Sequence, residues 1–307
     1  MDRFEAMSML LRVVEAGSLS AASRAMLVPL PTLSRKLSEL ETRLGTRLLV
    51  RTTRRLSLTD AGAAYVVAAR RILEQVEEAE REAAGEFTAP KGELVVTAPL
   101  LFGQLHVLPV IADFLALFPD INVRLVQSDR NVDLVDDHID MAVRIGRLAD
   151  SSMIATRIGG MRMVVCASPA LIAAGGVPLS PHDLSGRPSI DFIGPTPHPI
   201  WQFQEPAAGG AMAVSVRPRL IVTTAAAARD AAVRGVGFAR LLHYQVADEV
   251  REGRLSIVLE GYEFPPSPVS LLHAAHSQMP LKMRRFLDFA APRLRRALTA
   301  IGAETPG

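Results

Sequence analysis

Two short runs of apolar residues at helical spacing lie close together near the start of the chain. They consist of Leu19, Ala22, Ala25 and Met26, followed by Leu33, Leu37, Leu40 and Leu44. Because residues three or four positions apart share one face of a helix, each run predicts an amphipathic helix. The intervening residues 27–31 contain Pro29 and Pro31, which do not allow one helix to continue. The pattern therefore predicts a helix-turn-helix.

The second predicted helix carries short polar and basic residues away from its leucines. Such a face fits the major groove of DNA, where short side chains reach base edges and cations neutralise phosphates. An ordinary helical hairpin with a solvated face gives the same local pattern, so the flanking segments decide between the two. The candidate DNA-binding residues on this helix are Leu30, Pro31, Thr32, Ser34, Arg35 and Ser38.

The flanking segments complete a winged helix-turn-helix. Residues 2–16 predict a first helix with one apolar face, and Gly17 is suited to end it. After Gly45, residues 48–58 combine alternating leucines with β-branched residues and predict a small hairpin, or wing. Three arginines of this wing are expected to lie over the phosphate backbone, namely Arg51, Arg54 and Arg55.

A long helix without proline is predicted over residues 61–85. Its apolar positions step by four and three residues, which is the heptad spacing of a coiled coil. Packing onto the chain's own core is the alternative, but the other faces are acidic, which favours a dimerisation element over a DNA ligand. The predicted dimerisation residues are Tyr65, Ala69, Ile72, Val76, Ala79 and Ala83.

Beyond a Pro- and Gly-containing linker at 87–92, predicted strands alternate with predicted helices. This alternation indicates a mostly parallel sheet covered by helices, and the pattern begins again after residue 167, which indicates two α/β lobes. Ligands of such folds bind beyond the carboxyl ends of strands and between lobes. The expected strands are 94–98, 121–127, 141–145, 154–158, 163–167, 212–216, 220–222, 236–239, 256–259 and 269–274. The expected helices are 103–117, 132–138, 169–174, 224–234, 246–252 and 281–298.

The distribution of charge supports a DNA-binding segment at the start of the chain. Residues 1–60 carry 10 Lys and Arg against 6 Asp and Glu, whereas residues 61–90 carry 3 against 6. Cys166 is the only cysteine, which excludes an intrachain disulfide and a zinc site built on cysteines. No signal-peptide pattern and no run of about 20 apolar residues is found, so we expect a cytoplasmic protein without a membrane partner.

In this order of elements the chain resembles a LysR-type transcriptional regulator, and the resemblance covers nearly its whole length. Matching residues in the first part include Ala21-Ala22, Leu33-Ser34-Arg35 and Leu44-Gly45. Matching residues in the second part include Asp140 to Gly146, Ala167-Ser168-Pro169 and Gly235-Val236-Gly237. Together the two sets are specific, while either alone is only suggestive.

The resemblance implies an α/β fold class with an N-terminal winged helix-turn-helix, a long linker helix and a two-lobed regulatory domain similar to periplasmic solute-binding proteins. It places the DNA-binding domain at 1–60, the linker helix at 61–88 and the regulatory domain at 92–297. The first lobe would span 92–166 plus 268–297, the second 167–267, and the tail 298–307. Implied partners are operator DNA, a second copy in a homodimer or homotetramer, and a non-covalent small-molecule effector, with no other cofactor.

By the same resemblance, the effector cleft takes residues from both lobes. An organic acid is the expected effector, because amides at a helix N-terminus bind carboxylates well. Several apolar residues suggest a more apolar pocket than that of relatives that bind dicarboxylates. The implied effector-binding residues are Pro99, Leu100, Leu101, Phe102, Ser128, Asp129, Arg144, Ile145, Gly146, Phe203, Thr223, Thr224 and Leu241.

One departure from the family pattern affects the recognition helix. Pro29 and Leu30 stand where relatives usually have a capping serine and a polar residue. Loss of the cap costs about 1 kcal/mol, partly offset because Pro31 lacks an N–H that the helix start leaves unpaired. Since Leu30 can touch a thymine methyl but cannot hydrogen-bond, base recognition should depend on Thr32, Ser34, Arg35 and Ser38.

Two other classes of protein compete with a regulator. An α/β enzyme is disfavoured because the phosphate-loop, nucleophile-elbow and metalloprotease motifs are missing, and the Gly235 to Gly237 segment lacks a third glycine. His273 with His276, the carboxylates at Asp136, Asp137 and Asp140, and Cys166 each fit a structural role better than a metal or catalytic one. A solute-binding protein without a DNA role is disfavoured by the basic first segment.

Overall fold

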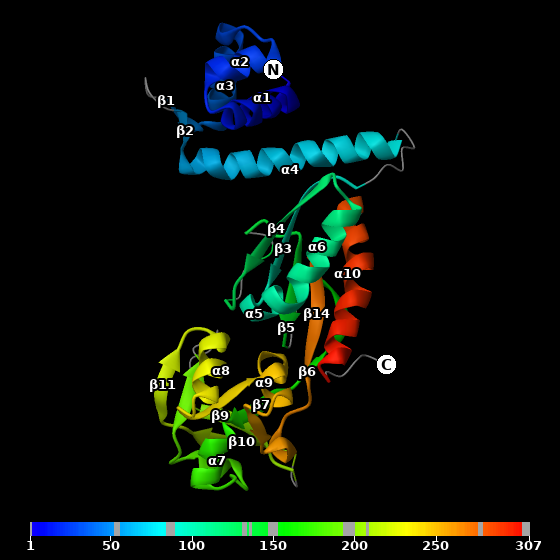
Figure 1. The fold of residues 1–307 in the computed structure, drawn as a ribbon. Coiled ribbons are helices and arrows are strands. Elements are labelled where there is room, and N and C mark those ends of the chain that lie inside the picture. Colours follow the sequence, from blue (N-terminus) through cyan, green and yellow to red (C-terminus); the bar gives the residue numbers. More distant parts are fainter. Residues whose placement is uncertain are drawn as a thin grey trace. The chain divides into compact units, whose positions relative to one another are not determined.

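The computed structural model of the chain describes residues 2–51, 56–83, 90–130, 134, 137–146, 153–192, 200–206, 209–275 and 279–302, and within these ranges it leaves the side chains of residues 51, 74, 77–79 and 81–83 undescribed. The chain divides into two compact units, Met1–Ala89 and Pro90–Gly307 (Figure 1). Each is taken by itself below.

The first unit is a helical bundle with a small hairpin and a long final helix. Its elements are α1 (Arg3–Ala16), α2 (Leu19–Met26), α3 (Leu30–Leu44), β1 (Leu49–Arg51), β2 (Leu56–Leu58) and α4 (Asp60–Ala83). Leu10, Leu33, Leu37 and Leu40 are buried in one core between the first three helices. The predicted three-helix core and wing are therefore confirmed.

The helix ends of the first unit follow from single residues. Asp2 caps α1 by accepting a hydrogen bond from the Phe4 amide at 3.0 Å, and Ser18 caps α2 by accepting one from the Ala21 amide at 3.1 Å. Gly17 and Gly45 end their helices in the left-handed region, at φ 68° and 67°. In the tight turn after α2, Leu27 also has a positive φ of 55°, although it is not a glycine.

The first turns of helix α4 pack against the core of their own unit. Tyr65 packs against the core between α1 and α3, and Ala69 is completely buried within the single chain. Ile72 is 36% exposed and Val76 is partly buried, while the side chains of Ala79 and Ala83 lie outside the described residues. The first part of the predicted heptad seam therefore serves packing onto the chain's own core, the alternative to dimerisation for this helix.

The second unit contains two five-stranded sheets, one in each lobe. In lobe I the strand order is β4-β3-β5-β14-β6. The strands are β3 (Gly92–Ala98), β4 (Ile121–Gln127), β5 (Met141–Ile145), β6 (Met153–Met161) and β14 (Ser267–Ala274). The helical elements are α5 (Leu100–Phe102), a π-helical turn η1 (Gly103–Val107), α6 (Leu108–Leu117) and α10 (Leu281–Ala300).

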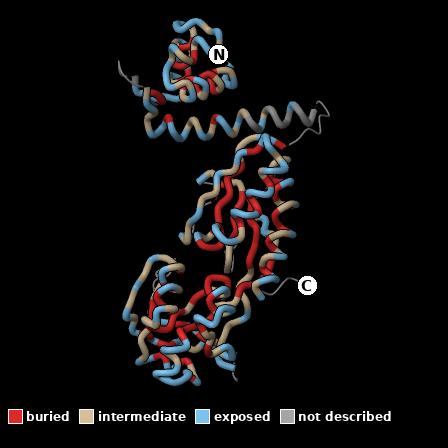
Figure 2. The backbone as a smooth tube through the Cα atoms, viewed as in Figure 1, coloured by how far each residue is buried: buried red, intermediate tan, exposed pale blue. Residues whose placement is uncertain are grey.

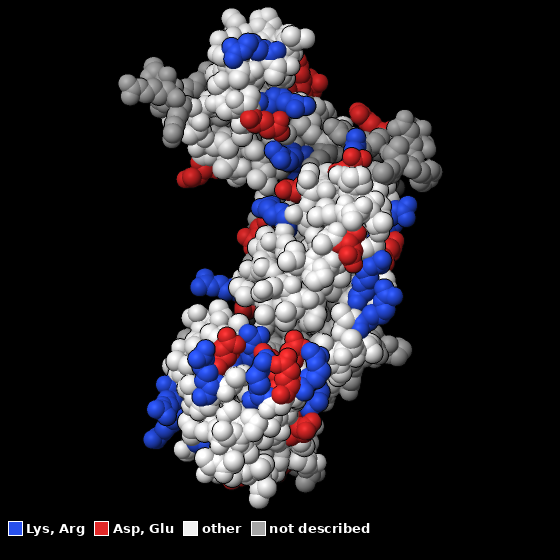
Figure 3. Space-filling model, in the orientation of Figure 1, with Lys and Arg blue, Asp and Glu red and all other residues white. Residues whose placement is uncertain are grey.

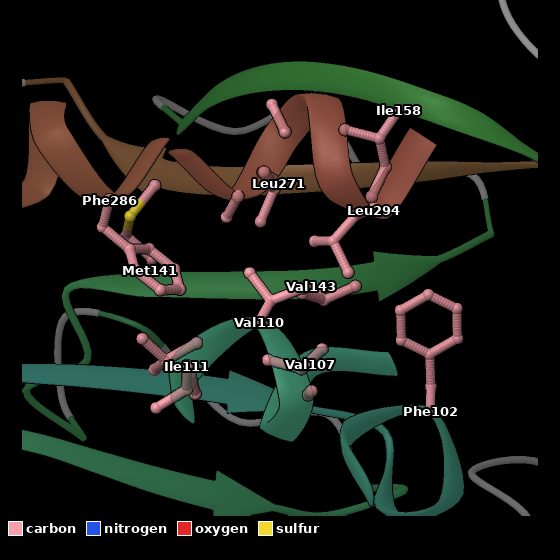
Figure 4. Packing of buried hydrophobic residues seen from close by; sticks show 14 of the residues in the cluster. Phe102, Val107, Val110, Ile111, Met141, Val143, Ile158, Leu271, Phe286 and Leu294 are labelled. Atoms are coloured by element: carbon pink, nitrogen blue, oxygen red, sulfur yellow. The ribbon is translucent and has the colours of Figure 1, made fainter. Parts of the chain in front are cut away.

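The core of lobe I lies between its sheet and the helices α6 and α10. Figure 4 shows Phe286 and Leu294 of α10 and Val110 of α6 gathered around Met141 and Val143 of β5. All five side chains are buried, and this burial is the main stabilisation of the lobe. The segment 100–117 is long and apolar enough to cross a membrane by length and composition alone, but here it contributes buried residues to this core.

In lobe II the strand order is β11-β8-β12-β7-β13, and a separate hairpin is formed by β9 and β10. The strands are β7 (Met163–Ala167), β8 (Ser189–Phe192), β9 (Ile200–Gln204), β10 (Ala211–Ser215), β11 (Pro218–Val222), β12 (Phe238–Leu242) and β13 (Ser256–Val258). The helices are α7 (Pro169–Gly175), η2 (Pro181–Leu184), α8 (Ala225–Val233), η3 (His243–Gln245), α9 (Ala247–Arg251) and η4 (Glu260–Tyr262).

The sheet of lobe II is buried on both faces. Ala239 and Leu241 pack with α8 on one face, whereas Phe238 packs with Trp201 and Phe203 of the β9-β10 hairpin on the other. Figure 2 shows buried segments at the centre of both lobes. Alternate residues of β12 therefore belong to two different cores.

The structure corrects three expectations from the sequence. Each sheet is mixed and not mostly parallel, because β14 and β6 in lobe I and β7 and β13 in lobe II run antiparallel to their neighbours. The strand β7 belongs to the second sheet, so lobe I ends near Met161 and not at residue 166. Strands β8 and β9 were not predicted. Most of the expected helix 132–138 lies outside the described residues.

A substitution in α4 tests the close packing between α4 and the wing. A Cβ added at Gly62 would lie 2.0 Å from the carbonyl oxygen of Leu48, which is backbone and cannot swing aside. Alanine favours a helix by about 1 kcal/mol over glycine, but overpacking costs about 1–3 kcal/mol. We therefore expect Gly62→Ala to lower the free energy of unfolding of the first unit, measured by urea denaturation.

The matched control is Ala63→Gly at the neighbouring exposed position, which should lose only about 1 kcal/mol of helix propensity. A Gly62→Ala protein more stable than wild type would contradict the close approach.

Candidate functional site

The recognition helix α3 presents the predicted DNA-binding residues on the side opposite its core. Leu33, Leu37 and Leu40 are buried, while Leu30, Pro31, Arg35 and Ser38 are exposed and Thr32 and Ser34 are half-buried. The side chain of Arg35 is 69% exposed and lies 3.4 Å from Glu39 Oε1, one turn further on. An exposed pair of this kind contributes little to stability, so Arg35 can exchange Glu39 for a phosphate or a base at small cost.

The start of α3 has no side-chain cap, as the sequence predicts. Pro29 occupies the N-cap position and no side-chain hydrogen bond is made there. Lys36 differs from the other cations of α3, since its ammonium group forms an ion pair with Glu5 of α1. This pair ties α3 to α1, and the side chain of Lys36 is less exposed than that of Arg35.

A half-buried carboxylate that the sequence analysis did not single out connects the wing to α3. Glu41 Oε1 accepts hydrogen bonds from the amides of Leu48 at 2.8 Å and Leu49 at 3.0 Å. The hydroxyl of Thr59 donates to the carbonyl of Arg47 at 2.7 Å. The base of the wing is thus fixed to the recognition helix. Arg54 and Arg55 lie outside the described residues, as does the side chain of Arg51.

In lobe I, the predicted effector-binding residues follow the carboxyl ends of three neighbouring parallel strands. β3, β4 and β5 end at Ala98, Gln127 and Ile145, so the segments Pro99–Phe102, Ser128–Asp129 and Gly146 meet at one edge of the sheet. Asp129 Oδ1 accepts a hydrogen bond from the Leu100 amide at 3.0 Å, which fixes two of these segments to each other. The structure thus brings together the lobe I segments that the sequence analysis grouped.

Arg144 supplies the positive charge at this edge. It lies near the end of β5, half-buried, and burial lowers the pKa of its guanidinium, which nevertheless remains protonated. A partly desolvated cation favours an anionic ligand more strongly than a fully hydrated one does. Leu100, in the segment that follows β3, is partly exposed and offers apolar surface.

The residues expected from lobe II are divided between several environments. Thr224 caps α8 by accepting a hydrogen bond from the Ala227 amide at 3.2 Å, and Thr223 precedes it at the carboxyl end of β11. Leu241 is buried under α8, and Phe203 is buried in the core on the opposite face of the sheet. The structure therefore does not bring Phe203 together with Leu241, and neither side chain is accessible in this conformation.

Phe102 also differs from its expected role, because it belongs to a cluster of aromatic rings that joins the two lobes. Its ring is fully buried, 5.2 Å from that of Tyr244 in an edge-on arrangement and 4.9 Å from that of His106. Tyr244 comes from η3 of lobe II, yet it packs in the core of lobe I, where burial raises the pKa of its hydroxyl. Sequence analysis missed His106 and Tyr244, since only the fold brings them next to Phe102.

A second connection lies where the chain crosses between the sheets. Arg162, between β6 and β7, donates to both carboxylate oxygens of Glu263 at 2.7 and 2.8 Å and to Glu260 at 2.7 Å. Bidentate charge-assisted hydrogen bonds are among the stronger polar contacts in proteins. Because Glu260 and Glu263 precede β14, this ion pair ties the two crossover segments together.

The part of the chain that the structure describes contains no group of three His, Cys, Asp or Glu residues placed to hold a metal ion. Cys166 is buried, and burial raises the pKa of its thiol to about 12, so that it is protonated at neutral pH and a poor nucleophile. His273 is buried with its Nδ1 2.9 Å from the carbonyl oxygen of Ala274, which fits a structural role.

A basic winged helix-turn-helix followed by a two-lobed α/β domain with a polar edge defines a ligand-responsive DNA-binding regulator. Comparison with known families agrees with this class. Residues 4–63 match the model of the bacterial regulatory helix-turn-helix protein, lysR family, and residues 88–295 match the LysR substrate binding domain. The chain belongs to the LysR family of transcriptional regulators.

Named relatives and solved structures extend over nearly the whole chain. The HTH-type transcriptional activator AaeR of Escherichia coli is 32% identical, with 92% of this chain and 91% of that protein covered. An HTH-type transcriptional regulator of Xanthomonas campestris is 33% identical, covering 92% of this chain and 83% of that protein. The structure of CrgA from Neisseria meningitidis matches with a TM-score of 0.60 and 30% identity, covering 96% of this chain and 99% of that one.

The buried histidine at the junction between the lobes gives a testable pH dependence. Burial lowers the pKa of His106 below its ordinary 6.5, and its Nε2 has no hydrogen-bond partner within the described structure. The unfolded chain therefore binds a proton more readily than the folded one, so stability is complete above 6.5 and falls as the pH drops below it. We expect His106→Gln to reduce the loss of melting temperature between pH 7.5 and pH 5.5.

The control is His182→Gln, which replaces an exposed histidine of lobe II. If both variants lost as much melting temperature on acidification as the wild type, His106 would not be the group responsible.

Proposed function

We propose that the regulator recognises its operator through α3 and responds to an organic anion held at the polar edge of lobe I. The observation that supports an anionic ligand is Arg144, a half-buried guanidinium near the carboxyl end of β5, while the partly exposed Leu100 lies in the segment that follows β3. A carboxylate would meet the cation while an apolar body contacts Leu100. The carboxyl ends of parallel strands are where α/β sheets bind ligands.

The response would be a change in the angle between the lobes. An effector that contacts both lobes stabilises the closed arrangement in proportion to its preference for that arrangement. The cluster of Phe102, His106 and Tyr244 and the ion pair of Arg162 are the contacts at which the lobes turn, because they join the two sheets. In an assembly of two or more copies, such a change alters the spacing of the recognition helices.

Operator recognition would be shared between base contacts and phosphate contacts. Thr32, Ser34, Arg35 and Ser38 have the short or cationic side chains that reach base edges from a helix in the major groove. The arginines of the wing, Arg51, Arg54 and Arg55, would neutralise phosphates and contribute affinity more than sequence preference. A protein of this kind would act in the cytoplasm, where its DNA lies.

Self-association through α4 is supported by its exposed apolar positions. Val67 is 37% and Ile72 is 36% exposed, although both are large apolar side chains on a helix of 24 residues. With Tyr65 and Ala69 committed to the core of their own unit, Ile72, Val76, Ala79 and Ala83 remain as the proposed dimer contacts. A dimer presents two recognition helices and fits an operator with two half-sites.

The test of operator recognition is Arg35→Ala, assayed by electrophoretic mobility shift on the DNA upstream of the protein's own gene. Loss of one base contact should weaken specific binding by about 1–3 kcal/mol, or roughly 5- to 150-fold, with little change in binding to unrelated DNA. The exposed Arg12 of α1, whose partner is Glu15, supplies the control Arg12→Ala. Undiminished discrimination by the Arg35→Ala protein would contradict the assignment, and no shift at low salt would contradict DNA binding itself.

A further inference from the structure

A small hollow in lobe II, separate from the edge that holds Arg144, is lined by an arginine that has no carboxylate partner among the described residues. Its walls come from β7, β9, β12 and the segment that leads back to lobe I, and it is partly open to solvent. The lining residues are Met163, Val165, Gln202, Phe203, Arg240, Leu259, Tyr262, Glu263 and Phe264.

The hollow lies on the face of the sheet away from α8. Along β12, Ala239 and Leu241 pack under α8, so Arg240 between them points to the other face, where Phe238 packs with the β9-β10 hairpin. Thr223 and Thr224, the lobe II residues assigned to the effector, stand at the start of α8. The hollow and the proposed effector cleft are therefore different places in the fold.

Arg240 is the unusual member of this group. Burial lowers the pKa of its guanidinium, yet within the described residues it forms no ion pair, and its contact is the face of the Phe203 ring at 5.9 Å. A cation–π contact compensates a desolvated guanidinium only in part. The carboxylate in the same wall, Glu263, accepts two hydrogen bonds from Arg162.

Arginines near α8 and α9 of lobe II, unlike Arg240, form ion pairs with acidic side chains. Arg229 and Arg254 both pair with Glu249, at 3.3 and 3.5 Å, and Arg251 pairs with Asp248 at 2.6 Å. Figure 3 shows basic and acidic side chains alternating on the visible face of this lobe. Arg240 is thus a partly buried cation that forms no ion pair with the residues the structure describes, whereas these arginines are matched within the chain.

We infer that the hollow beside Arg240 is a second binding site, for a small planar monovalent oxyanion of the size of formate or for the carboxylate end of a thin molecule. The guanidinium fork matches two oxygens of such a group, and the rings of Phe203, Tyr262 and Phe264 surround it with apolar surface. The interior accommodates only a group near the size of a water molecule without movement of the walls, which excludes bulky effectors.

The position of this site couples it to the junction between the lobes. Met163 follows the first crossover directly, and Leu259 to Phe264 form the second, which Arg162 holds through Glu260 and Glu263. An occupant would contact Met163, next to the first crossover, and the second crossover at once. Binding at the site does not depend on the proposed effector or operator, although its effect on lobe closure would.

The chain contains a natural reporter for the site, because Trp201 is its only tryptophan and precedes two lining residues, Gln202 and Phe203. We would titrate the full-length protein with sodium formate, holding ionic strength constant with sodium chloride, and follow the emission of Trp201. The expected result is a saturable change in wild type that weakens at least tenfold in Arg240→Gln. Arg240→Lys, which keeps the charge but not the fork, should bind with intermediate affinity.

Two further variants distinguish binding beside Arg240 from binding at another cation of the same unit. Arg187→Gln removes a guanidinium over another ring of the same lobe, that of Phe238 at 5.7 Å, and should titrate like wild type. Arg144→Gln should also titrate like wild type if the anion is beside Arg240. A non-saturable change in wild type, an unchanged titration in both Arg240 variants, or a titration lost in Arg144→Gln would each overturn the inference. Far-UV circular dichroism identifies any variant that is unfolded.

Discussion

The two lobes of the second unit are held together by the passage of the chain between two separate sheets. The chain leaves the first sheet at Met161 and returns to it at Ser267, and between these points it builds the whole of lobe II. The two sheets are joined by two crossover segments, and Arg162 of the first is tied to the second by its ion pairs with Glu260 and Glu263. Tyr244 adds an apolar contact by packing in the core of the opposite lobe.

In the first unit, a few contacts hold the helices and the wing together. One leucine-lined core holds three short helices, while the side chain of Glu41 binds the start of the wing to the recognition helix and the hydroxyl of Thr59 binds the end of the wing to Arg47. Because these contacts use the inner faces, the outer face of α3 keeps Arg35 and Ser38 exposed to solvent. The division between inner leucines and outer polar residues explains how so small a domain presents a rigid surface to DNA.

Elements with a strong local signal could be predicted from the sequence, whereas contacts between distant segments could not. The apolar spacing of α2 and α3, the helix end at Gly17 and the strands β4, β5 and β7 are properties of neighbouring residues, and the structure confirms them. The membership of β7 in the second sheet, the burial of Phe102 against Tyr244 and the separation of Phe203 from Leu241 depend on how the sheets assemble. The heptad spacing that includes Ala69 does not show whether the surface it packs against belongs to the same chain or to a second copy, because that also depends on how the elements assemble.

The central claim is that a DNA-binding unit and a ligand-binding unit act together in one regulator. Nuclease footprinting of the DNA upstream of the gene, with and without the small-molecule fraction of a cell extract, tests both halves at once. We expect a discrete protected region whose extent or intensity changes when the metabolites are added. Protection that is absent at low salt, or that metabolites never alter at any concentration tried, would contradict it.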